Sequence, residues 1–209
     1  MTPLEELARL GVATVHEAQG KTGLVDLPLV QVVPGSRVAG RVRTALCGDR
    51  DNLMVHAAVA HAGAGDVLVL TMPEPAPVAL VGDLLATQAL GQGVAAMLVD
   101  GAVRDLEELR ELGLPIWARY VRAQGATKQH VGSLDTPVLV GGARIEPGDV
   151  MVLDADGAVV VKAGQVDDVV HAAREREAHE RELRARYAAG ERSYDVNDLR
   201  RLVEGQRQA

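Results

Sequence analysis

The sequence predicts an α/β fold built around a parallel sheet. Strand-like apolar runs at 67–71, 95–99 and 116–120 alternate with helix-like segments at 83–90 and 106–112. A strand–helix–strand succession favours parallel strands with the helices packed against the sheet. The chain has 209 residues, enough to bury one sizeable core, and with no Phe and one Trp that core must consist mainly of small aliphatic side chains.

Local signals predict the elements on either side of this unit. Pro3 favours a first helix over 3–10, and Thr14 is predicted to cap a second short helical turn. A tight hairpin is expected around Asp156-Gly157. The other expected elements are strands at 30–33, 36–44, 137–140, 150–153 and 158–162, and helices beginning near residue 51 and spanning 165–189 and 196–204.

Composition excludes several classes of protein. The formal net charge is −7 and no polybasic stretch precedes residue 174, so a nucleic-acid backbone would be repelled. Cys47 is the only cysteine, which excludes a disulfide framework and fits a reducing, cytoplasmic setting. The N-terminal segment is acidic and no apolar run approaches about 18 residues, so neither a signal peptide nor a membrane span is predicted.

The segment 82–113 holds the best candidates for chemistry. Gly82 and Asp83 open a predicted helix, so the backbone N–H groups of Leu84 and Leu85 lie in its first turn without intrahelical partners. Such N–H groups bind carboxylate or phosphate readily. An acid in the first turn also suits the helix dipole, which is the structural alternative for Asp83.

A second junction follows the strand 95–99. The loop Asp-Gly-Ala-Val leads to Arg104 and Asp105, which could clamp an anionic substrate and hold a cation. Asp105 and Glu108 also form the pattern of a capping box for the next helix. Spacing alone leaves these two interpretations about equally supported.

Other catalytic groups are scarce. His56 and His61 are five residues apart, not the four of a helical zinc motif, and no histidine is expected to act in catalysis. No G-x-S-x-G elbow occurs, and Cys47 is predicted to be a small core residue. A Schiff-base enzyme would have to use one of the three lysines, Lys21, Lys128 or Lys162. Only Lys162, at the end of an apolar run, is expected to have a desolvated setting.

At this segment the sequence resembles the divalent-metal-dependent 4-hydroxy-4-methyl-2-oxoglutarate / 4-carboxy-4-hydroxy-2-oxoadipate aldolases, whose superfamily includes the regulator of ribonuclease E activity A. The family hallmark is D-x20-R-D, which Asp83, Arg104 and Asp105 match, and Glu108 completes R-D-x-x-E. The resemblance extends over nearly the whole chain.

The resemblance implies a role for each of these positions. Asp105 binds Mg²⁺ or Mn²⁺, Arg104 contacts a 2-oxo acid, and Asp83 holds a water molecule bound to the metal. Gly82 opens the substrate-binding turn, in which the amides of Leu84 and Leu85 receive the substrate carboxylate. Glu180 from a neighbouring subunit is expected to complete the surroundings of the metal; other nearby candidates on the same helix are Glu175, Glu177 and Glu182.

The resemblance also implies an αββα sandwich like a swivelling phosphohistidine domain, assembled as a homotrimer or hexamer. We therefore expect an aldolase-like domain over 1–163 and a helical extension for subunit contact over 164–209. The expected activity is retro-aldol cleavage of either 4-hydroxy-2-oxo acid to pyruvate, with oxaloacetate decarboxylation as a side activity. The alternatives are a non-catalytic regulator of a ribonuclease, disfavoured because regulator-type members tend to lack the extension, and a lysine Schiff-base aldolase.

Overall fold

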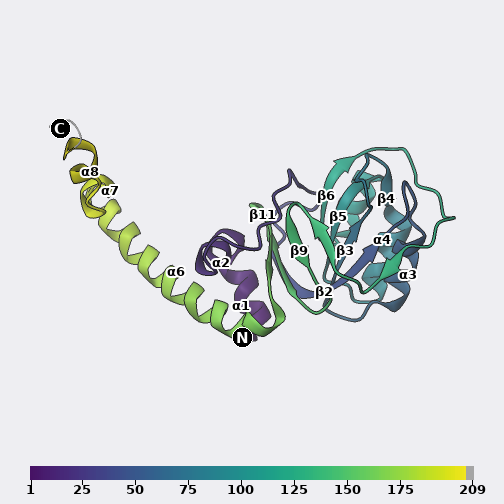
Figure 1. Ribbon diagram of the computed structural model, residues 1–209, viewed down its shortest axis with the longest axis horizontal. Helices are drawn as coiled ribbons and strands as arrows, with labels where there is room; N and C mark the ends of the chain where they lie inside the picture. Colours follow the sequence, from purple (N-terminus) through teal and green to yellow (C-terminus); the bar gives the residue numbers. More distant parts are fainter. Residues whose placement is uncertain (206–209) are drawn as a thin grey trace.

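A large mixed sheet forms the centre of the computed structural model, which describes residues 1–205 (Figure 1). Its hydrogen-bonded strands lie in the order β1-β6-β5-β3-β2-β10-β11, with β4 beside β5 and β7 beside β2. These strands are β1 (Val30–Gln31), β2 (Val38–Leu46), β3 (Asp66–Thr71), β4 (Ala79–Val81), β5 (Ala96–Val103), β6 (Ile116–Val121), β7 (Ser133–Leu134), β10 (Val150–Asp154) and β11 (Gly157–Val161). A separate hairpin pairs β8 (Val138–Val140) with β9 (Ala143–Ile145).

The centre of the sheet is parallel, which confirms the predicted α/β class. β2, β3, β5 and β6 are parallel neighbours, whereas β10 and β11 extend the sheet antiparallel. β5 is longer than predicted, because residues 100–103 continue the strand instead of forming a loop. All eight residues of β5 are buried, so this segment is held by packing from both sides. The short strand β4 was missed because its three residues give too little pattern.

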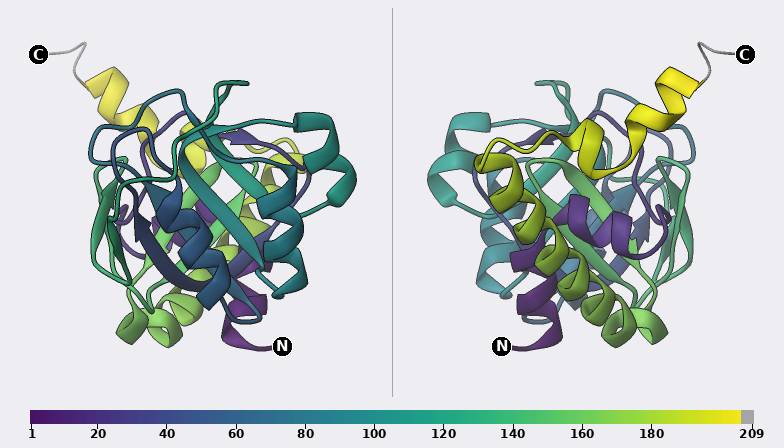
Figure 2. Two further views of the ribbon diagram at one scale, coloured as in Figure 1. Left: turned by 90° about the vertical axis from the view of Figure 1, so that its right-hand side faces the viewer. Right: turned by 90° about the vertical axis from the view of Figure 1, so that its left-hand side faces the viewer.

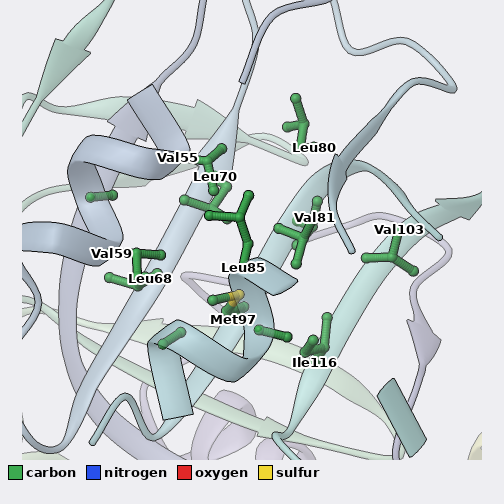
Figure 3. Close-up of a cluster of buried hydrophobic side chains, with 14 of the residues drawn as sticks. Val55, Val59, Leu68, Leu70, Leu80, Val81, Leu85, Met97, Val103 and Ile116 are labelled. Carbon is green, nitrogen blue, oxygen red and sulfur yellow. The ribbon is translucent and has the colours of Figure 1, made fainter. Parts of the chain in front are cut away.

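Three helices pack in the first hydrophobic core, and the segments that hold the candidate site residues belong to them or adjoin them. The helices are α3 (Leu53–His61), α4 (Asp83–Gly91) and α5 (Leu106–Leu112), and the left view of Figure 2 shows α3 and α4 in front of the strands. Figure 3 shows Leu85 of α4 among side chains that include Leu80 and Met97. Fully burying such side chains contributes roughly 1.5–3 kcal/mol each, so the first turn of α4 is fixed firmly against the sheet.

A second core contains Trp117, the only tryptophan. Its ring is 1% exposed, and its Nε1–H donates to the carbonyl oxygen of Asp154 at 2.7 Å. The carboxylate of Asp154 accepts from the backbone N–H of Val12 at 3.0 Å. These bonds connect β6, the end of β10 and the N-terminal helices.

The third core lies between β10, β11 and the helices α1 (Pro3–Leu10), α2 (Val12–Ala18) and α6 (Val166–Ala188). The prediction for Thr14 was wrong: the N-cap of α2 is Gly11, and Thr14 lies inside the helix, because α1 and α2 are separated by a single residue. The short helix η1 (Ala163–Gln165) leads from β11 into α6.

The C-terminal part of the chain is helical and projects from the body (Figure 1). Only the first turns of α6 are buried, through Val169, Val170 and Ala173. Beyond α6 lie α7 (Ser193–Val196) and α8 (Leu199–Gly205), separated near Asp198, whose φ is 53°. The helix predicted over 196–204 is confirmed as α8, which begins three residues later than predicted. The boundary at residue 163 stays a prediction, and residues 206–209 of the expected extension lie outside the described residues.

Candidate active site

The N-terminus of α4 lies directly after β4. The N-cap is Gly82, with extended backbone, and the first hydrogen bond of the helix runs from the Ala86 N–H to the Gly82 carbonyl at 3.1 Å. The N–H groups of Leu84 and Leu85 therefore precede the helical hydrogen-bond ladder. The Leu84 side chain is 78% exposed while Leu85 is buried. This turn can present backbone donors and the positive end of a helix dipole to an anion.

Asp105 lies between β5 and α5 and contacts the first turn of α4. Its backbone is left-handed, with φ 59° and ψ 50°, a conformation that Asp adopts more readily than most residues. Its Oδ2 atom accepts from the Asp83 N–H at 3.3 Å and lies 3.4 Å from Nε of Arg104. Although Asp105 occupies the N-cap position of α5, its side chain forms no capping hydrogen bond with residues 106–112. The capping-box interpretation of Asp105 and Glu108 was therefore wrong.

The Arg104 side chain passes close to two glycines. A Cβ atom at Gly82 would lie 2.5 Å from the Asp105 carboxylate and 3.1 Å from Arg104 Nε. A Cβ atom at Gly125 would lie 2.9 Å from Arg104 Nη1. Both spaces would thus be filled by any larger residue, and the two glycines let the arginine and the carboxylate approach the backbone closely.

A pocket of about 110 Å³ adjoins these groups. The predicted residues that line it are Gly82, Asp83, Leu84, Leu85 and Arg104. Asp105 lines the neighbouring depression, and Arg104 belongs to both. The pocket is smaller than the roughly 300–1,000 Å³ of a site for a drug-sized molecule, so it suits a small acid.

Three polar residues of this pocket escaped the sequence prediction: Asn52, His56 and Lys128. The expectation that no histidine is placed to act was wrong, because α3 carries His56 into the pocket lining. Burial lowers the pKa of His56, and the charge of Lys128 lowers that pKa further. The i,i+4 spacing of Asn52 and His56 was the one available signal, since such residues share a helix face.

The lysine of the pocket is also not the predicted one. Lys162 forms an ion pair with Asp149 at 2.8 Å and donates to the Arg144 carbonyl at 3.0 Å, away from the pocket. Lys128 lies in the loop 124–130, and no sequence pattern connects this loop with α4. The structure therefore removes the reason for choosing Lys162 as a Schiff-base residue.

Asp51 fixes the loop 124–130 beside α3. Its buried carboxylate accepts hydrogen bonds from the Thr127 hydroxyl and the Gln129 amide, both at 2.6 Å, and from the amides of Leu53 and His130. Burial raises the pKa of Asp51, but these hydrogen bonds together outweigh burial and hold that pKa below its usual value. The ionised carboxylate thus connects the segment that carries Lys128 with the helix that carries His56.

Cys47 is buried, as predicted for a core residue. Burial raises the pKa of its thiol to about 12, with a further contribution from the charge of Asp51. A thiol with that pKa is protonated at neutral pH, so Cys47 is a poor nucleophile.

Glu180 lies on the projecting part of α6, far from α4 within one chain (Figure 1). Its carboxylate pairs with Arg176 at 3.0 Å and Arg184 at 3.2 Å. Among residues 1–205, no cluster of three His, Cys, Asp or Glu side chains is arranged to hold a metal ion. The oxygen donors close to the pocket include the carboxylates of Asp83 and Asp105, which is the donor type that Mg²⁺ prefers.

These features define an α/β protein with a small pocket at a helix N-terminus, lined by backbone donors and an arginine. The sequence model of the family described as "RraA-like: Aldolase/RraA" matches residues 12–160. The chain belongs to this family, as the resemblance in the sequence predicted. Within residues 1–205, no helix is long and apolar enough to cross a membrane.

The relatives of this chain include a protein named as an aldolase and a protein named as a member of the RraA family. A protein of Halalkalibacterium halodurans named "Putative 4-hydroxy-4-methyl-2-oxoglutarate aldolase" is 35% identical over 142 residues, 68% of each chain. An uncharacterized protein of Pseudomonas syringae is 26% identical, with a TM-score of 0.82 over 94% of this chain and 93% of its own. Streptomyces coelicolor RraAS2, described as an unusual member of the RNase ES inhibitor RraA family, is 30% identical, with a TM-score of 0.76 over 87% of this chain and 95% of its own.

The RraAS2 match bears on the C-terminal extension. Residues 1–163 are 78% of the chain, so a match over 87% must include part of the extension. A relative described as an unusual member of a ribonuclease-inhibitor family thus shares some of this helical region, and the presence of an extension does not by itself separate aldolases from regulators.

Proposed function

We propose that this protein is a divalent-metal-dependent pyruvate aldolase. Its substrate would be 4-hydroxy-4-methyl-2-oxoglutarate or 4-carboxy-4-hydroxy-2-oxoadipate, cleaved to pyruvate and a second oxo acid, with oxaloacetate decarboxylation as a side activity. The observation that carries the proposal is the junction at which the Asp105 carboxylate contacts both Arg104 and the first N–H of α4. The name of the 35% identical relative supports the same activity.

The residues of the junction divide the work of binding. The amides of Leu84 and Leu85 and the guanidinium of Arg104 bind the carboxylate of the 2-oxo acid, because backbone donors and a fixed arginine together suit a planar anion. Arg104 also stabilises negative charge that develops on the 2-oxo group during cleavage. Asp83 orients water beside the reacting atoms, and Gly82 leaves room for Arg104 and Asp105.

The donor set fits Mg²⁺ or Mn²⁺ as the cofactor. Asp105 would hold the cation directly, and Asp83 would act through water, since Mg²⁺ retains much of its hydration. A bound divalent cation supplies Lewis-acid stabilisation of the enolate. Because one chain brings so few acidic groups together, we propose that Glu180 of a neighbouring subunit completes the surroundings of the cation in a homotrimer or hexamer.

The test is pyruvate release from 4-hydroxy-4-methyl-2-oxoglutarate and from oxaloacetate, with Mg²⁺ and then with excess EDTA. We expect turnover of both compounds, loss of both activities in EDTA, and recovery with Mn²⁺. Asp105→Ala should abolish pyruvate release while the far-ultraviolet circular dichroism stays unchanged. Full activity in that variant, or in EDTA, would contradict the proposal.

Mixing two inactive variants tests the role of Glu180. Asp105→Ala and Glu180→Ala homomers are each expected to be inactive, whereas hetero-oligomers reassembled from both should regain part of the activity, because some sites then receive both intact residues. Absence of recovery in verified hetero-oligomers would count against a site shared between subunits.

The second candidate is a non-catalytic regulator that binds a ribonuclease. The match to RraAS2 over 95% of that chain favours keeping it. It predicts tight association with a ribonuclease and no metal-stimulated release of pyruvate. If neither substrate is turned over and a ribonuclease is bound and inhibited, the regulator is the better assignment.

A further inference from the structure

Two side chains of the pocket have a buried polar atom without a hydrogen-bond partner in residues 1–205. These atoms are Oδ1 of Asn52 and Nε2 of His56. Asn52 is 7% exposed, and its Nδ2 donates to the Leu80 carbonyl at 2.9 Å. That bond fixes which end of the amide is the acceptor, so Asn52 offers Oδ1 as an unused acceptor. Buried polar groups are normally paired, and both residues line the pocket described above.

The chemistry of these two atoms selects a particular ligand group. An amide oxygen accepts hydrogen bonds only, and a neutral imidazole nitrogen can either donate or accept. Burial and the charge of Lys128 lower the pKa of His56, which favours the neutral imidazole. A second carboxylate would be repelled by the Asn52 oxygen, whereas a hydroxyl can donate its single proton to one of the two atoms at a time.

Hydrogen bonds hold Asn52 close to the N-terminus of α4. Asn52 is tied to the end of β4 through Leu80, two residues before Gly82. Asn52 also donates its backbone N–H to the Thr127 carbonyl at 2.9 Å, so it is fixed from both sides. Because Leu84, Leu85, Asn52 and His56 line one pocket of about 110 Å³, a small ligand with its carboxylate at the two leucine amides lies beside Asn52 and His56.

We propose that the C4 hydroxyl of the substrate donates to Nε2 of His56, which accepts its proton in the cleavage step, and that the neighbouring Asn52 oxygen disfavours a carboxylate in this part of the pocket. This inference rests on the proposed function. It assigns a hydroxyl-specific half to the pocket, beside the half that binds the 2-oxo acid, and it makes His56 a catalytic residue and Asn52 a residue that determines specificity.

The step is balanced in atoms and electrons. The C4 hydroxyl proton passes to Nε2, the C4–O electrons form the new carbonyl, and the C3–C4 bond breaks. The electron pair of that bond stays on C3 as the enolate of pyruvate, which is then protonated by the imidazolium, returning His56 to its neutral form. Oxaloacetate loses CO₂ to give the same enolate without surrendering a hydroxyl proton, so it does not need the base.

This difference between the two substrates provides the test. His56→Gln is expected to lower kcat for 4-hydroxy-4-methyl-2-oxoglutarate by about 10²–10⁴-fold, the usual contribution of a general base. Oxaloacetate decarboxylation should stay within about threefold of wild type. His61→Gln is the matched control, because His61 ends the same helix with an exposed side chain outside the pocket. It should change both activities by less than about twofold.

Equal losses on both substrates would assign His56 a merely structural role, and no loss on either would exclude it from catalysis; both results overturn the inference. If wild type turns over neither compound, the proposed function fails. NMR of ¹⁵N-histidine-labelled protein with Mg²⁺ then tests whether the hydroxyl of the ligand contacts His56. The His56 imidazole should then respond to 4-hydroxy-4-methyl-2-oxoglutarate but not to 2-oxoglutarate. An absent or equal response to the two acids would overturn it.

Discussion

Helices α1 and α5 both begin with the sequence pattern of a capping box, an N-cap Thr or Asp followed three residues later by Glu, but only α1 forms the capping box. At α1 the Thr2 hydroxyl accepts from the Glu5 N–H at 3.2 Å, and the Glu5 carboxylate accepts from the Thr2 N–H at 2.7 Å, which is a complete capping box. At α5 the corresponding Asp105 has a left-handed backbone and gives its carboxylate to α4 instead.

The difference comes from what precedes each helix. Thr2 has an extended backbone, with φ −70° and ψ 161°, as is usual for an N-cap residue. Asp105 follows the long buried strand β5, and its left-handed backbone directs the carboxylate toward Gly82. An N-cap carboxylate that does not cap its own helix can thus bind another group, and the Asp105 carboxylate binds the N-terminus of α4.

The largest expected effect is at Asp105. Asp105→Asn keeps the shape of the side chain and its tolerance for the left-handed backbone, but it removes the negative charge. We expect Mg²⁺-dependent pyruvate release to fall at least about 10³-fold, because a catalytic cation would lose its charged ligand. Steady-state kinetics over a Mg²⁺ series measures this, and activity restored by moderate Mg²⁺ would show that the charge is dispensable.

Gly82→Ala should follow in size. The new Cβ would meet the ends of the Asp105 and Arg104 side chains, which can turn away at little cost in stability but then leave their positions. We expect pyruvate release to fall by about 10–10²-fold, as for small misplacements in other enzymes. Gly91→Ala is the control, because a Cβ there meets nothing within 4 Å, and it should leave activity intact. Equal activity of the two variants would contradict the close-approach argument.

Thr2→Ala should affect stability alone. Loss of the capping side chain is expected to lower the free energy of unfolding by about 1 kcal/mol, with pyruvate release within about twofold of wild type. Denaturant unfolding followed by circular dichroism measures the change. Thr14→Ala, inside α2, should be neutral or slightly stabilising, since Ala is the better helix former. The opposite ranking would mean that the caps are assigned wrongly.

The smallest effect is expected in the pH dependence of stability near Glu6. Hydrogen bonds from Arg9 and Arg174 lower the pKa of this carboxyl from 4.5 to about 2. A depressed pKa stabilises the fold above the unfolded-state value, and that stabilisation is lost as pH falls through the folded-state value. Glu6→Gln should therefore lower Tm at pH 7, and the gap to wild type should narrow between pH 4.5 and 2. A constant gap would contradict the assignment.

Much of the fold could be predicted because it rests on short-range patterns. The helices α4 and α5 and the strands between them follow from periodicity, and the spacing from Asp83 to Arg104 and Asp105 placed all three at one end of the parallel sheet. In parallel sheets, ligands bind beyond the carboxyl ends of the strands, so local order in the sequence becomes proximity in space.

The other half of the pocket could not be predicted in this way. Lys128 and His56 meet only because the loop 124–130 is bonded to Asp51, and a loop without periodicity gives no hint of where it packs. The error over Lys162 has the same origin, because an apolar run predicts burial of a strand but not the partner Asp149 at its end.

Trp117 gives this protein an optical property that follows from its packing. The indole is buried, bonded to the carbonyl of Asp154, and accompanied by only three tyrosines in the chain. Its fluorescence therefore reports from one place, the second core at β6 and the end of β10. An emission maximum that moves to longer wavelength marks the opening of that core, without a second tryptophan to average over.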